Sequence, residues 1–152
     1  MSETPSQPLF YGQPEPLSSE RHRNWRLTNG DYAFAAATPS VPILVSEFAA
    51  AARDYPIVFA QGSSAPIAVL GLEPANLFVN DGHWTEGCYI PAYVRRYPFG
   101  FIQAPEPDRF VLGVDILSTR LSENGAEGLP LFDGDQPSPI TRDMLAFCET
   151  FQ

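Results

Sequence analysis

The sequence predicts an α+β fold in which short, mostly antiparallel strands form a sheet and two or three helices pack on it. Sixteen prolines and eleven glycines divide the 152 residues into short apolar runs, a pattern typical of short elements joined by turns. Several links between runs have hairpin length, which favours antiparallel pairing. The length suits one domain, so we expect a single domain over residues 18–152, preceded by an extended N-terminal arm over residues 1–17.

The arm and the first strands come from the N-terminal quarter. The arm contains Pro5, Pro8, Pro14 and Pro16. Proline fixes φ and lacks a backbone donor, so we expect the arm to have no regular structure. A strand-like stretch opens at Trp25 and a second strand is predicted over residues 32–38. Asn29-Gly30 lies between them and tolerates positive φ, which predicts a hairpin.

A helix is predicted over residues 46–54, because apolar residues recur there at helical spacing. Ser46 can cap its start, and Glu47 suits the positive end of its dipole. Two strands follow at residues 57–60 and 66–71, joined by a loop of hairpin length.

The second half continues the same pattern. A strand at residues 76–79 is followed by the turn Asp81-Gly82, and residues 91–97 predict a short helix between two prolines. Residues 99–103 and 109–115 flank a proline-rich turn and predict an antiparallel pair.

The C-terminal part is predicted to be a loop and a helix. Residues 118–137 are polar and contain glycine, so they are expected to be a loop. Ser138 and Pro139 then begin the last helix. Its expected apolar face consists of Ile140, Met144, Phe147, Cys148 and Phe151.

Charge and composition exclude several function classes. The net charge is −9 and all nine basic residues are arginines, so a phosphate backbone would be repelled and general nucleic-acid binding is not expected. Without lysine, Schiff-base chemistry through a lysine amine is excluded. We find no phosphate-binding glycine loop and no nucleophile elbow, and we expect no cofactor.

The cysteines, the histidines and the N-terminus carry no further signal. Cys88 and Cys148 match no zinc pattern and are interpreted as buried free thiols, with a disulfide as the alternative. His22 and His83 are the only histidines, so no metal site is expected. Residues 1–12 lack the pattern of a signal peptide. No apolar run approaches the roughly 20 residues that span a bilayer.

The best candidate binding residues are two adjacent arginines, Arg95 and Arg96, between Tyr93 and Tyr97. Arginine's planar fork suits carboxylate or phosphate, and the rings could stack on a ligand. Alternatively, one of the arginines pairs with an internal acid of the protein while the tyrosines pack. Trp84 adds to an aromatic stretch over residues 84–101, which is either a docking patch or part of the core.

A second basic cluster consists of Arg21, His22 and Arg23, close to Trp25. It could hold an anionic group or a partner's acidic surface. The alternative is an exposed polar segment that leads into a strand.

The most specific block of the sequence is Tyr89-Ile90-Pro91-Ala92-Tyr93-Val94-Arg95-Arg96-Tyr97-Pro98-Phe99. Further blocks lie at residues 20–24, 32–36, 41–42, 47–48, 54–59, 68–72, 76–79, 131–133 and 137–139. Together these blocks resemble the SapC family of bacterial surface-layer-associated proteins. Members of the family are longer and have a further helical C-terminal portion, which we expect this chain to lack.

The resemblance implies an association with bacterial surface layers, but it supplies no catalytic residues. We therefore expect a non-catalytic binding or assembly protein with a protein or peptide partner, located in the cytoplasm or at the periphery of the envelope. One alternative is an enzyme that holds a small anionic or peptide substrate with Arg95 and Arg96. Another is a structural homo-oligomer, a dimer whose function lies in the absent C-terminal portion.

Overall fold

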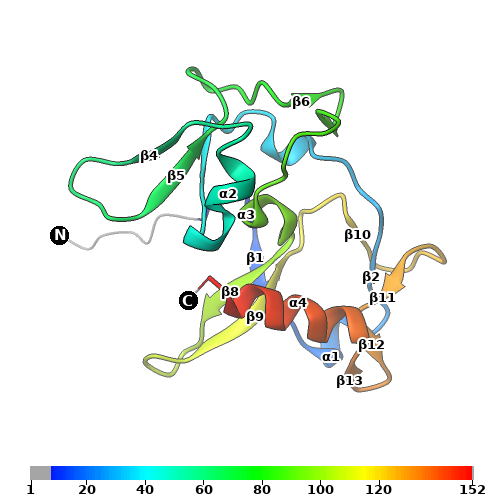
Figure 1. Cartoon of the computed structure of the whole chain (residues 1–152). Coiled ribbons are helices and arrows are strands. Elements are labelled where there is room, and N and C mark those ends of the chain that lie inside the picture. Colours follow the sequence, from blue (N-terminus) through cyan, green and yellow to red (C-terminus); the bar gives the residue numbers. More distant parts are fainter. Residues whose placement is uncertain (1–7, 152) are drawn as a thin grey trace. The chain divides into compact units, whose positions relative to one another are not determined.

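The computed structural model describes residues 8–151, and their contacts cluster in two compact units. Unit 1 takes Met1–Gly30 and Arg96–Gln152, and unit 2 takes Asp31–Arg95. Both units combine short helices with antiparallel strands (Figure 1). The predicted α+β class is confirmed, although the strands sort into separate sheets of two or three strands.

The largest sheet of unit 1 is built on the predicted hairpin. β8 (Phe99–Gln103) pairs with β9 (Phe110–Asp115), with Phe99 opposite Val114. β1 (Pro14–Pro16) pairs with the other side of β9. The prolines were expected to prevent regular structure in this segment. They form a strand because β1 is an edge strand, where a missing N–H can face away from the sheet.

The segment predicted as a loop over residues 118–137 contains four short strands. They are β10 (Leu121–Ser122), β11 (Leu129–Pro130), β12 (Phe132–Asp133) and β13 (Gln136–Pro137). β2 (Arg26–Leu27) lies between β10 and β11, and β12 pairs with β13. Strands of two residues are too short to show alternation, so the loop prediction was wrong here.

The last helix of unit 1 begins as predicted. α4 (Pro139–Glu149) starts after Ser138, whose hydroxyl oxygen accepts a hydrogen bond from the N–H of Thr141 at 3.4 Å. α4 lies across β8 and β9 (Figure 1) and buries Cys148. The core cluster consists of Trp25, Phe99, Val114, Leu131, Phe132 and Cys148. A short helix, α1 (Ser19–His22), lies near the start of this unit.

Unit 2 opens with a helical turn where a strand was predicted. Residues 32–38 contain the 3-10 helix η1 (Ala33–Ala35), so the strand and the hairpin at Asn29-Gly30 were wrong. The Asp31 carboxylate accepts a hydrogen bond from the N–H of Ala33 at 3.0 Å, which begins a turn. Alanine also favours helical backbone. These local preferences outweigh the tendency of the apolar run to form a strand.

The sheet of unit 2 contains one predicted pair and one strand that was missed. β4 (Ile57–Phe59) pairs with β5 (Pro66–Val69), as expected. β3 (Ser40–Pro42) pairs with the other side of β5. Pro39 and Pro42 obscured β3 in the sequence, because proline argues against a strand unless that strand lies at an edge.

The helices of unit 2 are shorter than predicted. η2 (Val45–Glu47) and α2 (Phe48–Ala51) replace the expected helix over residues 46–54, and α3 (Ala92–Arg95) replaces the one over residues 91–97. Ser46 does not cap the helix. The Glu47 carboxylate instead accepts from the N–H of Leu44 at 2.7 Å.

The turn at Asp81-Gly82 was predicted correctly and joins β6 (Val79–Asn80) to β7 (His83–Trp84). Both turn residues have positive φ, 48° and 76°, as a two-residue hairpin turn requires. The strand at residues 76–79 was misplaced, since only Val79 belongs to β6. None of the helices in residues 8–151 is long and apolar enough to cross a membrane.

Candidate functional site

The candidate residues predicted from the sequence divide between the two units. Trp84, Tyr93 and Arg95 belong to unit 2. Arg21, His22, Arg23, Arg96 and Tyr97 belong to unit 1. Arg95 and Arg96 therefore fall on opposite sides of the unit boundary although they are adjacent in the chain.

In unit 2, Arg95 is part of a chain of hydrogen bonds that ends at a buried carboxylate. Its Nη2 donates to Tyr89 Oη at 3.1 Å, and its Nε donates to the carbonyl oxygen of Ile90 at 3.0 Å. Tyr89 Oη in turn donates to Glu47 Oε1 at 2.9 Å. Glu47 is 5% exposed. The Arg95 side chain is thus oriented by the protein's own groups.

Glu47 is the centre of this network. Besides Tyr89, its carboxylate accepts from the backbone N–H groups of Leu44 and Ala92, each at 2.7 Å. Burial first, and the hydrogen bond to Glu47 second, raise the pKa of Tyr89, so this phenol remains a donor near neutral pH. Sequence reasoning missed Glu47 as a buried group, because its apolar neighbours Val45 and Phe48 predicted only an amphipathic helix.

The two aromatic candidates of unit 2 lie in its core. Trp84 and Tyr93 are each 8% exposed. Trp84 Nε1 donates to Tyr55 Oη at 3.0 Å, and Tyr55 Oη donates to the carbonyl oxygen of Tyr89. Burial raises the pKa of Tyr55 to about 12. These rings stabilise the unit and offer little area to a partner.

The basic cluster of unit 1 is engaged by acids of the same unit. Arg21 forms an ion pair with Glu15 at 2.9 Å, and Arg23 forms one with Asp135. Both arginines are exposed, and ion pairs at the surface contribute little stability. A competing anion can therefore replace Glu15 or Asp135 as the partner of these arginines.

His22 does not belong to that exposed surface. It is fully buried, and its ring meets the Trp25 ring edge-on with centroids 4.9 Å apart. Desolvation lowers its pKa below the usual 6.5, which favours a neutral imidazole. His22 is therefore a core residue rather than a third cation of the cluster.

Arg96 and Tyr97 lie against aromatic and acidic groups of unit 1. The Arg96 guanidinium lies over the rings of Phe151 and Tyr11, 4.8 and 5.9 Å from their centroids. Tyr97 is 6% exposed and donates from Oη to Asp115 Oδ2 at 2.9 Å. Burial, with the Asp115 hydrogen bond, raises the pKa of Tyr97 to about 12.

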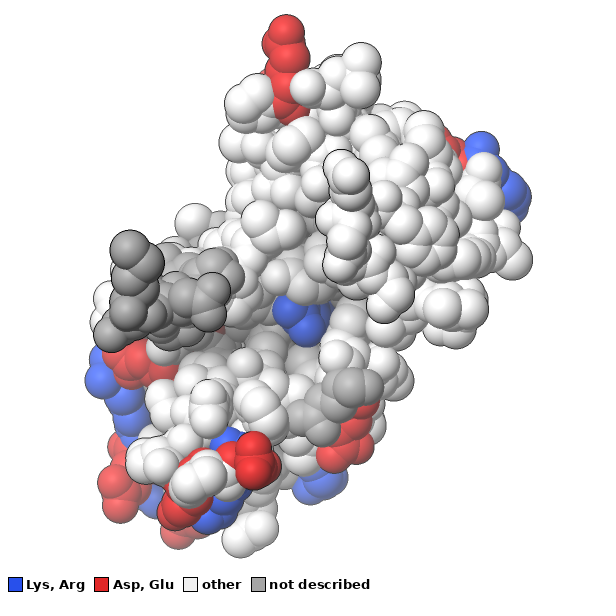
Figure 2. Space-filling model, turned by 90° about the vertical axis from the view of Figure 1, so that its left-hand side faces the viewer, with Lys and Arg blue, Asp and Glu red and all other residues white. Residues whose placement is uncertain are grey.

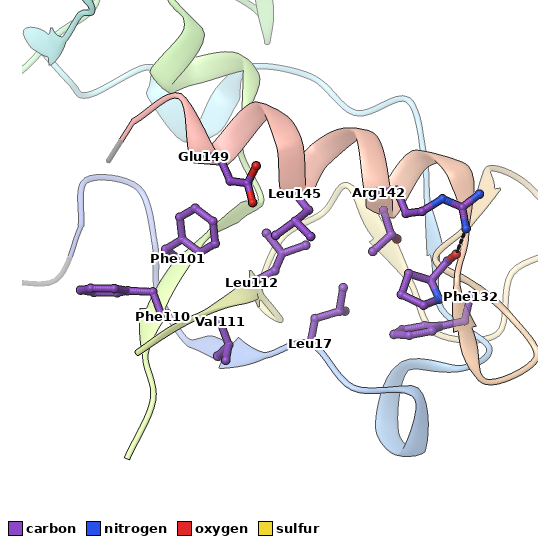
Figure 3. Close-up of a pocket in the computed structure, with 11 residues that line it drawn as sticks. Leu17, Phe101, Phe110, Val111, Leu112, Phe132, Arg142, Leu145 and Glu149 are labelled. Atoms are coloured by element: carbon purple, nitrogen blue, oxygen red, sulfur yellow. Dashed lines mark hydrogen bonds between the residues drawn. The ribbon is translucent and has the colours of Figure 1, made fainter. Parts of the chain in front are cut away.

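Unit 1 carries an apolar groove that sequence reasoning did not find. Its volume is about 390 Å³. It lies between α4 and the β8–β9 hairpin (Figure 3), and it is lined by Leu17, Phe101, Phe110, Val111, Leu112, Phe132, Pro137, Thr141, Arg142, Leu145 and Glu149. The lining residues come from segments that are far apart in the sequence. No single stretch of sequence therefore predicts the groove.

The groove has an apolar middle and charged ends. Leu145 of α4 lies between Arg142 and Glu149, and Leu112 faces Leu145 from the sheet (Figure 3). Arg142 Nη1 donates to the carbonyl oxygen of Pro137 at 2.8 Å. Phe110 and Leu145 remain 52% and 38% exposed. Apolar area of this kind favours association with another apolar surface.

A second hollow of unit 1, of about 520 Å³, is more polar. It is lined by Arg23, Asn24, Arg26, Asn124, Gly125, Pro130, Phe132 and Gly134. Arg26 Nη1 donates to the carbonyl oxygen of Gly128 at 2.8 Å, and Arg23 pairs with Asp135. Both guanidinium groups thus have partners within the unit.

The surface charge is mixed, and the described residues hold no metal-binding cluster. On the face shown in Figure 2, several arginines lie beside acidic side chains, and large uncharged areas separate the charged groups. Within residues 8–151, no group of three or more His, Cys, Asp or Glu side chains could hold a metal ion.

Comparison with known proteins identifies a family. The family model of SapC matches residues 17–152. No curated protein and no solved structure matches the chain.

Proposed function

Since the chain belongs to the SapC family, we propose that it is a non-catalytic binding or assembly protein of bacterial surface-layer or envelope biology. It binds a protein partner through the apolar groove of unit 1. The observation that carries this proposal is the exposure of Phe110 and Leu145 beside a groove with an apolar middle. We place its work in the cytoplasm or at the periphery of the envelope.

The composition of the groove favours a protein or peptide over a small polar substrate. Protein interfaces are typically apolar at the centre and polar at the rim. Leu145 and Leu112 provide such a centre, and Arg142 and Glu149 provide such a rim. Small-molecule sites instead combine an apolar lining with several convergent polar groups that fix the orientation of the ligand.

The titratable groups of the core support a non-catalytic role. Tyr55 and Tyr97 have pKa values raised to about 12 by burial. Burial also raises the pKa of the Cys148 thiol to about 11, which disfavours the reactive thiolate at neutral pH. These groups contribute to packing and hydrogen bonding rather than to proton transfer.

The enzyme alternative requires Arg95 and Arg96 to hold one anionic substrate. Arg95 is held by Tyr89 and Ile90 within unit 2, and Arg96 lies over Phe151 and Tyr11 within unit 1. Neither arginine lines either of the two hollows of unit 1. We therefore favour the binding protein.

Co-sedimentation with an isolated surface-layer or envelope fraction tests the proposal. We expect the wild-type chain to sediment with the fraction and Leu145→Asp to remain in the supernatant, because a buried carboxylate without a partner opposes association. Leu72→Asp is the matched control, since Leu72 is 96% exposed in unit 2. Equal sedimentation of all three proteins, or of none, would contradict the proposal.

A further inference from the structure

The exposed face of α4, from which Arg142, Leu145 and Glu149 line the groove, carries opposite charges at its two ends. Arg142 lies three residues before Leu145, and Glu149 lies three residues after Ala146. All four side chains are exposed. Spacings of three, four and seven residues place them on one stripe of a helix. Arg142 and Glu149 are thus equally distant in sequence from the bond between Leu145 and Ala146, so the stripe has a positive end, an apolar middle and a negative end.

Such a stripe is complementary to a second copy of itself. Two α4 helices that pack antiparallel about a two-fold axis at Leu145–Ala146 would place Arg142 of each copy opposite Glu149 of the other. A two-fold interface uses the same patch on both copies, so each such contact occurs twice. Seven residues of α-helix span about 10.5 Å, which separates the two ion pairs and leaves the apolar centre between them.

From this complementarity we infer that the partner in the groove is a second copy of the chain. The protein is then a homodimer through α4, and this dimer is the form that binds the envelope fraction. The inference rests on the proposed function, because it takes the groove as the docking surface. Leu145 of each copy lies at the centre of the contact, and the exposed Phe110 adds apolar area at one end of the groove.

The hydrogen bond from Arg142 to Pro137 supports this geometry. Arg142 Nη1 is fixed on the carbonyl oxygen of Pro137 at 2.8 Å, so part of the entropy of ordering this long side chain is lost before association. The remaining donors of its guanidinium fork can then meet a carboxylate. Glu149, at the other end of the groove (Figure 3), is a carboxylate of this type.

Charge reversal in the 152-residue chain tests the pairing. Analytical ultracentrifugation up to millimolar concentration should show a monomer–dimer equilibrium for the wild type. Arg142→Glu and Glu149→Arg should each weaken dimerisation by about tenfold or more, because each change places like charges opposite one another at two contacts. The double variant should regain the wild-type affinity.

Mixing the single variants gives the sharpest result. One copy then carries two glutamates and the other two arginines at these positions, so a heterodimer should form more tightly than either homodimer. Arg53→Glu and Glu86→Arg make the same changes of charge at exposed positions of unit 2 and should leave the equilibrium unchanged, alone and when mixed.

Two outcomes would overturn the inference. One is a wild type that stays monomeric throughout the concentration range. The other is a dimer that neither charge reversal nor mixing affects more than the unit 2 controls do. The proposed function and the dimer are contradicted by different results. A monomeric chain whose envelope binding still depends on Leu145 retains that function with a different partner, whereas a dimer that never binds the envelope fraction loses it.

Discussion

The hydroxyl of Tyr97 donates a hydrogen bond to Asp115 Oδ2 at 2.9 Å, and both side chains are buried. The same carboxylate accepts from the backbone N–H groups of Gly12 and Gln13, at 3.0 and 2.8 Å. Asp115 ends β9, so one carboxylate joins the sheet, the tyrosine and the N-terminal segment before β1. A buried carboxylate is stable in the fold when several donors satisfy it, as here.

Replacement of Asp115 by alanine is expected to destabilise the protein strongly. The change removes the carboxylate that accepts from the Tyr97 hydroxyl and from the backbone N–H groups of Gly12 and Gln13. This loss should lower the free energy of unfolding by about 3 kcal/mol. Urea denaturation measures the loss. Asp143→Ala, an exposed change on α4, should alter stability by less than about 0.5 kcal/mol. Similar losses in the two variants would contradict the role assigned to Asp115.

Glu47→Ala should destabilise unit 2 by a similar amount. The change removes the acceptor for Tyr89 Oη and for the N–H groups of Leu44 and Ala92, and each unsatisfied buried donor costs about 1–3 kcal/mol. Hydrogen exchange at the amides of Leu44 and Ala92 should become faster than elsewhere in unit 2. Tyr89→Phe keeps both backbone bonds, so these two amides should stay protected in that variant. Loss of their protection in Tyr89→Phe would show that the phenol, not the carboxylate, orders this region.

His22 should make stability depend on pH below about 6.5. Its pKa in the folded protein is lowered by burial, whereas the unfolded chain has the usual value near 6.5. As the pH falls below 6.5, the unfolded state binds a proton more readily, so the free energy of unfolding decreases. His22→Gln should remove this component between pH 7.5 and 5.

The exposed His83 is the matched control. His83→Gln should show the same pH dependence of unfolding as the wild type. A His22→Gln curve parallel to that of the wild type would mean that His22 titrates alike in both states, contrary to its complete burial.

The two cysteines should differ in reactivity. Cys148 is fully buried and burial raises its thiol pKa to about 11, whereas Cys88 is half-buried. Because the thiolate is the reactive form, a thiol reagent should modify Cys88 alone in the native protein and both residues after denaturation. Mass spectrometry of the labelled chain identifies the site. Native Cys88→Ser should take up no label; rapid labelling of Cys148 in this variant would show that the α4 core opens readily.

Local signals predicted the elements whose conformation depends on their own residues. Ser138 and Pro139 begin α4, Asp81-Gly82 forms the hairpin turn between β6 and β7, and residues 99–103 and 109–115 pair as expected. The cap and the turn are each determined by a side chain or a φ angle that affects only the neighbouring residues. The family is also recognisable from sequence blocks alone.

Tertiary structure decided the features that depend on residues far apart in the chain. β3 forms because β5 offers it a free edge, and Glu47 is buried because Tyr89 and Ala92 supply donors to it. The groove requires α4, Leu17 and the β8–β9 hairpin together. The sequence by itself determined the α+β class, the turn at Asp81-Gly82 and the start of α4, since these follow from local backbone preference. Burial, pairing partners and the open apolar surface depend on long-range packing, which no local pattern encodes.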